Sequence, residues 1–253
     1  MIRGTYVSES GLVASQARMD MLSNNIANVS TTGFKEILAT QTDAGTTVGL
    51  MFGDGTSWSG LGPLSYGTMA AGETVNHLQG PLITTGNPAD LAIAGDGLFA
   101  VGTPNGVAFT RAGDFVVDAT GTLTTQVGQP VLDTTGRPIL VPGATAGTGS
   151  ATAFAVSPDG TVAGTGQRIA LVAFPATGVT RLGDNLYAIT GQVTPVAAGA
   201  GTIQQGTLEG SNVNLANSMT ELIAVQRTFQ LSARSLSLQD GTLEDANNVG
   251  KVK

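Results

Sequence analysis

The stretch SNNIANVSTTGFK, residues 23–35, decides how the chain is organised, because a pattern of helical spacing ends in it and a different pattern follows. Its three asparagines, Asn24, Asn25 and Asn28, are poor helix formers whose side chains compete for backbone groups. They therefore favour the end of a helix, and we expect a neighbouring chain to use the hydrogen bonds that their amides offer. Gly33 suits a turn that stops the helix.

On the N-terminal side of this stretch, apolar residues follow helical spacing from about residue 7 to about residue 29. Neither Gly nor Pro interrupts the chain between Leu12 and Ala27, so we expect a helix roughly 35 Å long. After the turn, Phe34 anchors the chain as it leaves the helix. The apolar positions form a heptad seam with Ser15 in its gap: Leu12, Met19, Leu22, Ile26 and Val29.

The C-terminal end repeats this pattern over about residues 214–248. Asn212 or Asn214 fits the N-cap, and Gly241, which costs about 1 kcal/mol relative to Ala, predicts fraying beyond it. An isolated amphipathic helix is marginal in water, so we expect the two terminal helices to pair as a short coiled coil. A second possibility is that the pair leaves apolar surface for further copies of the chain. The C-terminal seam comprises Leu215, Met219, Leu222, Gln226, Phe229, Ala233, Leu236, Asp240 and Leu243.

The middle of the chain has the pattern of an antiparallel β domain, with short apolar runs about 8–12 residues apart. Asp-x-x-Gly or Asp-Gly sequences at Asp118, Asp133 and Asp159 separate these runs. Asp starts turns through side-chain hydrogen bonds, and Gly accepts a positive φ angle. The expected strands are Leu91–Ile93, Leu98–Val101, Val107–Arg111, Phe115–Val117, Leu123–Thr125, Pro130–Leu132, Ile139–Val141, Phe154–Val156, Val162–Ala163, Ile169–Phe174 and Leu186–Ile189.

These patterns predict an α+β fold of four segments. An N-terminal helix within residues 1–35 and a C-terminal helix within residues 209–253 form a coiled-coil domain. Residues 36–69, rich in Gly, Thr and Ser, form an extended linker. Residues 70–208 form the β-rich domain, with a surface loop at 143–150.

Composition excludes several classes of protein. The 253 residues carry a net charge of −7, only 11% of them are charged, and the chain has no Cys and one His. Disulfide frameworks, thiolate or His-rich metal sites and Cys nucleophiles are therefore excluded. The 11 Lys and Arg are scattered, which argues against nucleic acid, and no apolar run is long enough for membrane insertion. We expect no catalytic, cofactor-binding or metal site.

The N-terminal residues and the composition predict different cellular locations for the protein. Residues 1–5 lack the charged start and apolar core of a secretory signal peptide, which taken alone points to the cytoplasm. The low charge, the 36 glycines and the missing Cys instead fit an exported protein that assembles.

Four features of the sequence suggest catalysis or ligand binding. Residues 95–100, GDGLFA, match a dinucleotide-binding fingerprint, but strand-like residues follow where a helix is required, so we expect a tight hairpin turn. The Asp-x-x-Gly sites lack the calcium-loop pattern, and His77 alone supports no Ser-His-Asp triad. A hydrolase would need paired carboxylates with shifted pKa values, and Asp96, Asp114 and Asp118 are candidates only by proximity in sequence.

Three strings together resemble a known family. Residues 23–35 closely resemble the N-terminal signature of the bacterial flagellar basal-body rod and hook proteins. Residues 85–99, TGNPADLAIAGDGLF, look like the segment where that family's β domain begins. Residues 208–213, LEGSNV, leading into the C-terminal seam, look like the start of its last helix. The strings follow the family's order along nearly the whole chain.

The resemblance implies a structural subunit, with no enzymatic activity and no cofactor, that polymerises into the helical, tubular drive shaft of the flagellum. The paired helices would form an inner layer and the β domain an outer one. The implied partners are copies of the chain, other rod proteins, surrounding ring proteins and the flagellar export apparatus. The implied location is the basal body in the cell envelope, reached by type III export without a cleaved signal.

Within the family, the chain's length favours a rod protein over a hook protein, which usually has a larger outer domain. The short segment between the N-terminal motif and the β domain favours the proximal over the distal rod. A distal rod or hook-type protein stays the alternative, and a secreted β-sandwich binding module is a more distant one.

The resemblance also implies which residues carry function. We expect the terminal helices to be disordered in the free monomer, so that proteolysis leaves about residues 70–208. The family's motif turns correspond to Gly33, Phe34, Gly95, Asp96 and Gly97. The expected subunit-interface residues are Leu12, Met19, Leu22, Asn24, Asn25, Ile26, Asn28, Met219, Leu222, Phe229, Leu236 and Leu243.

Overall fold

The computed structural model describes residues 2–43, 45–51, 59–65, 67–142, 154–174, 178–190, 195–196 and 201–251. The chain forms two compact units, each assembled from separated segments. The helical unit contains Met1–Ala27, Ile37–Asn76 and Asn214–Lys253, and the β unit contains Asn28–Glu36 and His77–Val213. The loop expected at residues 143–150 lies outside the described residues.

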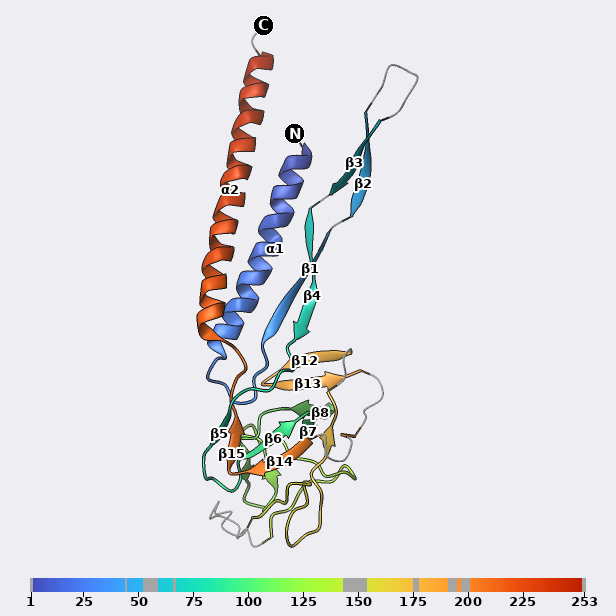
Figure 1. The fold of residues 1–253 in the computed structure, drawn as a ribbon, viewed down its shortest axis with the longest axis vertical. Coiled ribbons are helices and arrows are strands. Elements are labelled where there is room, and N and C mark those ends of the chain that lie inside the picture. Colours follow the sequence, from blue (N-terminus) through green and yellow to red (C-terminus); the bar gives the residue numbers. More distant parts are fainter. Residues whose placement is uncertain are drawn as a thin grey trace. The chain divides into compact units, whose positions relative to one another are not determined.

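Two antiparallel helices, α1 (Ile2–Ala27) and α2 (Leu215–Lys251), lie side by side in the helical unit (Figure 1). Their direction follows from the pairs that meet, since Arg18 forms an ion pair with Glu221 while Gly11 lies against Ser232. Asn214 is the N-cap of α2, because its Oδ1 accepts the Asn217 amide at 3.1 Å. The prediction of a helix at each end of the chain is therefore confirmed, with α1 ending one residue before Asn28. The fraying expected beyond Gly241 is wrong, because α2 continues through this residue to Lys251.

The prediction that residues 36–69 form an extended linker is wrong for those of them that the structure describes. They form β1 (Ile37–Asp43), β2 (Thr46–Met51) and β3 (Ser59–Ser65), and the chain continues into β4 (Thr68–Val75). β1 pairs with β4 and β2 with β3, all antiparallel, and we call these four strands the ribbon (Figure 1). The Gly and Thr content of this segment does not predict strands. The strands form because distant segments pair, for example Ile37 opposite Val75, and this pairing supplies their backbone hydrogen bonds.

In its described residues, the β unit contains a five-stranded antiparallel sheet in the order β11-β7-β8-β13-β12, and three two-stranded pairs, β14-β6, β15-β5 and β10-β9. Its core is apolar and includes Leu91, Phe99, Phe115 and Ile169, all at most 1% exposed. Its strands are β5 (Leu82–Thr84), β6 (Leu91–Gly95), β7 (Leu98–Thr103), β8 (Gly106–Thr110), β9 (Val116–Val117), β10 (Leu123–Thr124), β11 (Leu171–Val172), β12 (Val179–Gly183), β13 (Leu186–Ile189), β14 (Gly201–Gln205) and β15 (Thr207–Glu209).

The predicted strands of the middle region are only partly present as strands. The runs at 130–132, 139–141, 154–156 and 162–163 make isolated β-bridges instead, because each meets its partner at single residue pairs. The hairpin expected at 95–97 is also wrong: β6 pairs with β14, whereas β7 pairs with β8 and β11. Residues 95–97 form a turn between strands of different sheets.

The predicted Asp turns are confirmed. The Asp118 carboxylate accepts the amides of Thr120 and Thr122, each at 2.8 Å, and Asp133 receives the same pair of bonds from Thr135 and Arg137. Hydrogen bonds from Thr120 and Thr122 hold the pKa of Asp118 below 3.8, because they favour the charged carboxylate. These aspartates fix turns through hydrogen bonds to their own loops.

Candidate functional site

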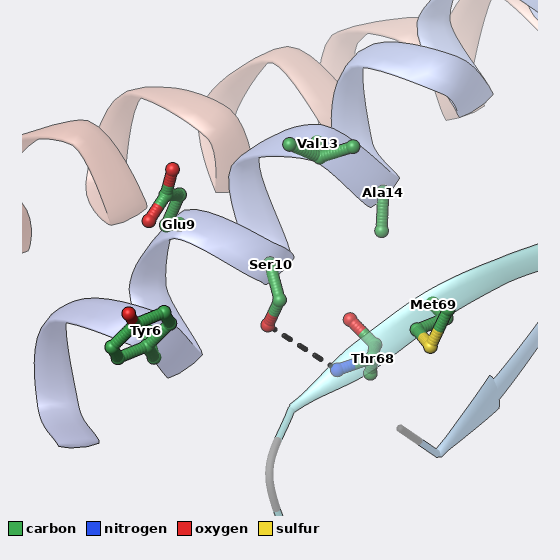
Figure 2. A pocket seen from close by; sticks show the side chains of 7 residues that line it. All are labelled: Tyr6, Glu9, Ser10, Val13, Ala14, Thr68 and Met69. Carbon is green, nitrogen blue, oxygen red and sulfur yellow. Dashed lines mark hydrogen bonds between the residues drawn. The ribbon is translucent and has the colours of Figure 1, made fainter.

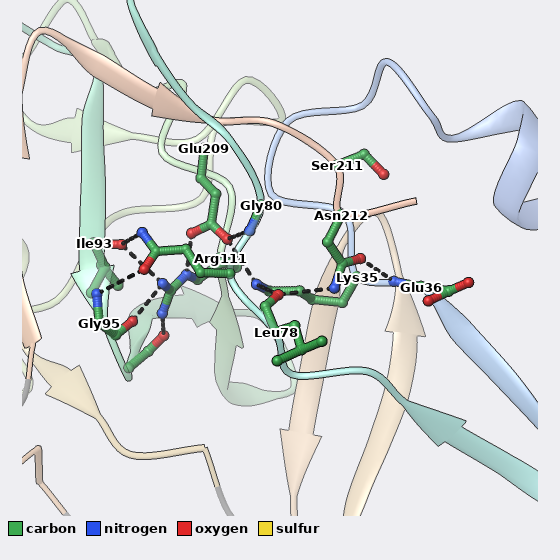
Figure 3. Close-up of polar contacts among 12 residues, drawn as sticks. Lys35, Glu36, Leu78, Gly80, Ile93, Gly95, Arg111, Glu209, Ser211 and Asn212 are labelled. Carbon is green, nitrogen blue, oxygen red and sulfur yellow. Dashed lines mark hydrogen bonds and ion pairs between the residues drawn. The ribbon is translucent and has the colours of Figure 1, made fainter. Parts of the chain in front are cut away.

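Among the described residues of the β unit, Glu209 at the end of β15 is the most deeply buried charged residue, and it is 1% exposed. Its Oε1 accepts hydrogen bonds from Lys35 Nζ at 2.7 Å and from the Gly80 amide at 2.8 Å. Its Oε2 accepts one from Arg111 Nε at 2.5 Å (Figure 3). We call Lys35, Arg111 and Glu209 the ion cluster.

The two cations of the ion cluster also bind backbone carbonyls. Lys35 Nζ donates to the Leu78 carbonyl at 2.8 Å. The Arg111 guanidinium donates to the carbonyls of Ile93 and Gly95, at 2.9 and 2.6 Å, and to that of Gly97. Arg111 therefore holds the 95–97 turn and the strand before it through their carbonyls, and Figure 3 shows the bonds to Ile93 and Gly95.

One carboxylate faces two cations in this buried place, so the cluster has one positive charge in excess. Burial lowers the pKa of Lys35, while the hydrogen bond and the negative charge of Glu209 oppose that shift. All three side chains are at most 5% exposed, so the two cations are costly to bury unless the Glu209 carboxylate is present. Because each charged group has fixed partners, the arrangement is suited to holding chain segments together and not to moving protons.

The turn after α1 joins the ion cluster through its backbone. The Gly33 amide donates to the Glu209 carbonyl at 2.7 Å, and Gly33 adopts a φ of +66°. A Cβ on this residue would lie 2.4 Å from the Ala112 nitrogen, so only glycine fits. Phe34, 1% exposed, lies beneath the Arg181 guanidinium at 5.3 Å from the ring centroid.

Asn212 closes the other side of this junction. Its Oδ1 accepts the Glu36 amide at 2.7 Å, and its Nδ2 donates to the Leu78 carbonyl at 2.9 Å (Figure 3). Asn212 is therefore a bridge between three chain segments, and the N-cap role belongs to Asn214.

The ion cluster thus unites the three strings that the sequence singled out. Lys35 ends the first string, the 95–97 turn belongs to the second, and Glu209 lies in the third. Of the expected motif turns, Gly33, Phe34, Gly95 and Gly97 lie at the cluster, and Asp96 is exposed. Sequence reasoning did not single out Lys35, Arg111 or Glu209. The available signal was a charged residue within each of three apolar or Gly-rich segments, in a chain where charge is rare.

The expected interface residues divide by exposure. Leu22 is buried, Leu12, Met19, Ile26, Leu222, Phe229 and Leu236 are half-buried, and Met219 and Leu243 are exposed. Among the asparagines, Asn24 is exposed and Asn28 half-buried, with its Oδ1 accepting Thr31 Oγ1 at 3.1 Å.

Asn25 requires a correction, because it bonds within its own chain. Its Nδ2 donates to the Ile37 carbonyl at 2.8 Å, and its Oδ1 accepts the Ile37 amide at 3.0 Å. The side chain is 1% exposed. The start of β1 lies beside the end of α1, and Asn25 satisfies the Ile37 backbone groups that would otherwise be buried without partners.

The aspartates considered as candidates for hydrolysis make separate contacts in the structure. Asp114 faces Asp90 across an isolated bridge, and burial raises the pKa of Asp114. Asp90 is held by Thr85 and Asn87, and Asp118 serves its own turn. Within the described part of the chain, no three His, Cys, Asp or Glu residues come close enough to hold a metal ion.

His77 is placed by an aromatic neighbour. Its ring lies 3.7 Å from that of Phe174, centroid to centroid. Burial lowers its pKa, and the charge of Lys35 adds to the effect.

Neither helix in the described ranges combines the length and the apolar character needed to cross a membrane.

Comparisons with known proteins agree with the positions of the three strings. Residues 6–35 match the family model for the flagella basal body rod protein, residues 92–164 that for the flagellar hook protein FlgE/F/G D1 domain, and residues 204–249 that for the flagellar basal body rod FlgEFG protein C-terminal region.

Individual relatives match over almost their whole length. The flagellar basal-body rod protein FlgG of Bacillus subtilis is 35% identical over 277 residues, covering 98% of this chain and 99% of the relative. The flagellar basal-body rod protein FlgF of Caulobacter vibrioides is 34% identical over 249 residues, covering 96% and 95%. The FlgG protein of Borreliella burgdorferi is 31% identical over 266 residues, covering 98% and 99%. The chain therefore belongs to the flagellar basal-body rod protein family.

Proposed function

We propose that this chain is a structural subunit of the flagellar basal-body rod and polymerises into a helical tube that transmits torque from the motor to the hook and filament. The observation that carries the proposal is the antiparallel pair of terminal helices, which leaves large apolar side chains exposed on both helices. Family membership over nearly the full chain supports the same role. The activity is mechanical and needs no cofactor.

Within this proposal, the paired helices form a coiled-coil inner layer and the β unit an outer one. Heterologous contacts that do not close on themselves generate helical assemblies, which suits a tube. Leu12, Met19, Leu22, Ile26, Leu222, Phe229 and Leu236 fill the seam between the helices, and Asn24 and Asn28 face neighbouring subunits. The partners are copies of the chain, other rod proteins, ring proteins and the export apparatus, which delivers the subunit without cleaving a signal.

We place the subunit in the proximal rod, with the distal rod as the alternative. The argument is the short segment between the N-terminal motif and the β unit. Relatives named FlgF and FlgG match with similar identity, 34% and 35%, so identity alone does not separate the two positions.

Deletion of the gene in the source bacterium, combined with cryo-EM of isolated basal bodies, tests the function. We expect the deletion strain to lack hook and filament. We expect the map of wild-type basal bodies to contain this chain in the rod, and its place along the rod axis to distinguish the proximal from the distal position. Normal flagella in the deletion strain would overturn the proposal.

A further inference from the structure

Helix α2 carries two apolar faces. The first, which includes the buried Val225, packs on α1. The second contains Ile223, Leu231 and Leu238, which are 53%, 69% and 66% exposed. At 100° per residue this second face points away from α1.

Two arginines interrupt the second apolar face. Arg227 and Arg234 are exposed, and the series 223, 227, 231, 234 and 238 advances in steps of four and three, which keeps all five on one side of the helix. We call these five residues the outer stripe. The outer stripe therefore combines three exposed apolar side chains with two positive charges on one side of α2, a combination that suits an interaction surface.

A groove of about 450 Å³ lies elsewhere on the helical unit, where α1 meets β4. Tyr6 and Val13 of α1 and Met69 of β4 line it, and all three are exposed (Figure 2). Ser10 fixes the two walls, because its Oγ accepts the Thr68 amide at 3.4 Å. The groove is a preformed apolar depression.

Charge distinguishes the two surfaces. Glu9 is the one charged residue among the side chains that line the groove, whereas the two charges of the outer stripe are both arginines. An apolar side chain of the stripe can fill the groove while an arginine beside it meets the Glu9 carboxylate. Such complementarity fixes register and orientation more than it adds affinity.

The two surfaces cannot meet within one chain. In Figure 1, α1 lies between α2 and the ribbon, so the groove and the outer stripe are on opposite sides of the helical unit. The stripe of one copy can reach only the groove of another copy. Because two different surfaces meet, each copy keeps one of each free, and the contact continues from copy to copy.

We propose that the outer stripe of α2 packs into the α1–β4 groove of the next copy of this chain, with Glu9 facing Arg227 or Arg234. The inference rests on the proposed rod function and names the faces through which the subunits join.

Cysteine cross-linking tests it directly, because the chain has no Cys of its own. The double variant Val13→Cys with Leu231→Cys is expressed in the source bacterium in place of the natural chain, and its basal bodies are isolated and oxidised. We expect a ladder of dimers, trimers and larger species, since each copy offers both positions. Each single variant alone should stay monomeric, and dimers from Val13→Cys alone would overturn the head-to-tail contact.

Two controls accompany the double variant. Gly11→Cys with Ser232→Cys joins α1 to α2 inside one chain and should give oxidised monomer only. Val13→Cys with Val127→Cys, which pairs the groove with an exposed residue of the β unit, should give no ladder.

Charge reversal adds a second readout. Replacing both Arg227 and Arg234 by Glu in the cross-linking background should lower the ladder yield about tenfold through like-charge repulsion with Glu9, and adding Glu9→Arg should restore it. Basal bodies that contain the chain but show no ladder would overturn this inference and leave the rod function standing. Basal bodies without the chain would overturn the rod function, and this inference with it.

Discussion

At the scale of single residues, the ion cluster is where the structure depends most on one side chain. Glu209 compensates two buried cations, so its loss leaves Lys35 and Arg111 together without a carboxylate. Loss of Lys35 would instead leave a balanced pair of Arg111 and Glu209. The order of these two effects distinguishes an ion cluster from ordinary packing.

Glu209→Gln is expected to lower the free energy of unfolding by about 3–5 kcal/mol, because it leaves buried charge uncompensated. Lys35→Met should cost clearly less. Urea unfolding measures both, and Asp184→Asn, which removes an exposed carboxylate from the β12–β13 turn, is the matched control and should have little effect. Equal losses for Glu209→Gln and Lys35→Met would contradict the charge argument.

Gly33 is required for two separable reasons, its φ angle and the close approach of its backbone to residues 111–112. Gly33→Ala should therefore cost about 1–2 kcal/mol for the left-handed conformation and about 1–3 kcal/mol more for the clash.

Gly136→Ala isolates the first of these terms. Gly136 has a φ of +80°, and a Cβ there would meet nothing within 4 Å. Urea unfolding of both variants should show the larger loss for Gly33→Ala, and a loss no larger than that of Gly136→Ala would refute the close-approach argument.

At the scale of elements, the Asp turns give the β unit a pH dependence of known sign. Hydrogen bonds hold the pKa of Asp118 below its ordinary value of 3.8, and those from Thr161 do the same for Asp159. A carboxyl group whose pKa is lower in the folded state stabilises the fold above pH 3.8, and this stability is lost as the pH falls through the folded-state pKa.

Asp118→Asn keeps an acceptor oxygen but removes the charge. We expect it to be less stable than the natural chain at pH 7, and the difference should shrink as the pH drops below about 3.8. Thermal unfolding at pH 7 and at pH 3 measures the two gaps. A gap that widens in acid would show that the sign is wrong.

The ribbon shows what an element needs from distant sequence. Its strands are rich in Gly and Thr, and an isolated two-stranded hairpin is only marginally stable in water. Here β1 and β4 lie against α1, and Asn25 fixes the start of β1 by two hydrogen bonds to Ile37. The ribbon is therefore held by packing and capping, which composition does not reveal.

At the scale of the whole molecule, neither unit is a continuous piece of the chain. The β unit includes residues 28–36, which lie far in sequence from its other segment, 77–213. This changes the domain boundary expected from composition. A fragment of residues 70–208 lacks Lys35 and Glu209, and so leaves Arg111 buried without its carboxylate.

We therefore predict that a fragment of residues 28–213 unfolds cooperatively and is more stable than one of residues 70–208. Urea unfolding of the two fragments measures the difference, and limited proteolysis of the free full-length chain should give a resistant core that retains residues 33–35 and 209–213. Equal stability of the two fragments would show that the ion cluster contributes nothing.

The sequence by itself determined the features that depend on neighbours along the chain. Helical periodicity located α1 and α2, and the Asp-Gly spacing located the turns, because each depends on hydrogen bonds and side-chain spacing within a few residues. For the cap of α2 the sequence offered Asn212 or Asn214, and the structure selected Asn214. The three strings also pointed to the family, since their order is a property of the chain alone.

Only the tertiary structure decided the features that join distant segments. Glu209 bonds Lys35, 174 positions away in sequence, and Arg111, 98 positions away. Ile37 pairs with Val75. The outer stripe of α2 is recognised only because the structure shows which face of α2 packs on α1. Local propensity carries no information about such pairs. They form because burial makes each unpaired charge, amide or apolar face costly, and packing of the whole chain determines which partner removes that cost.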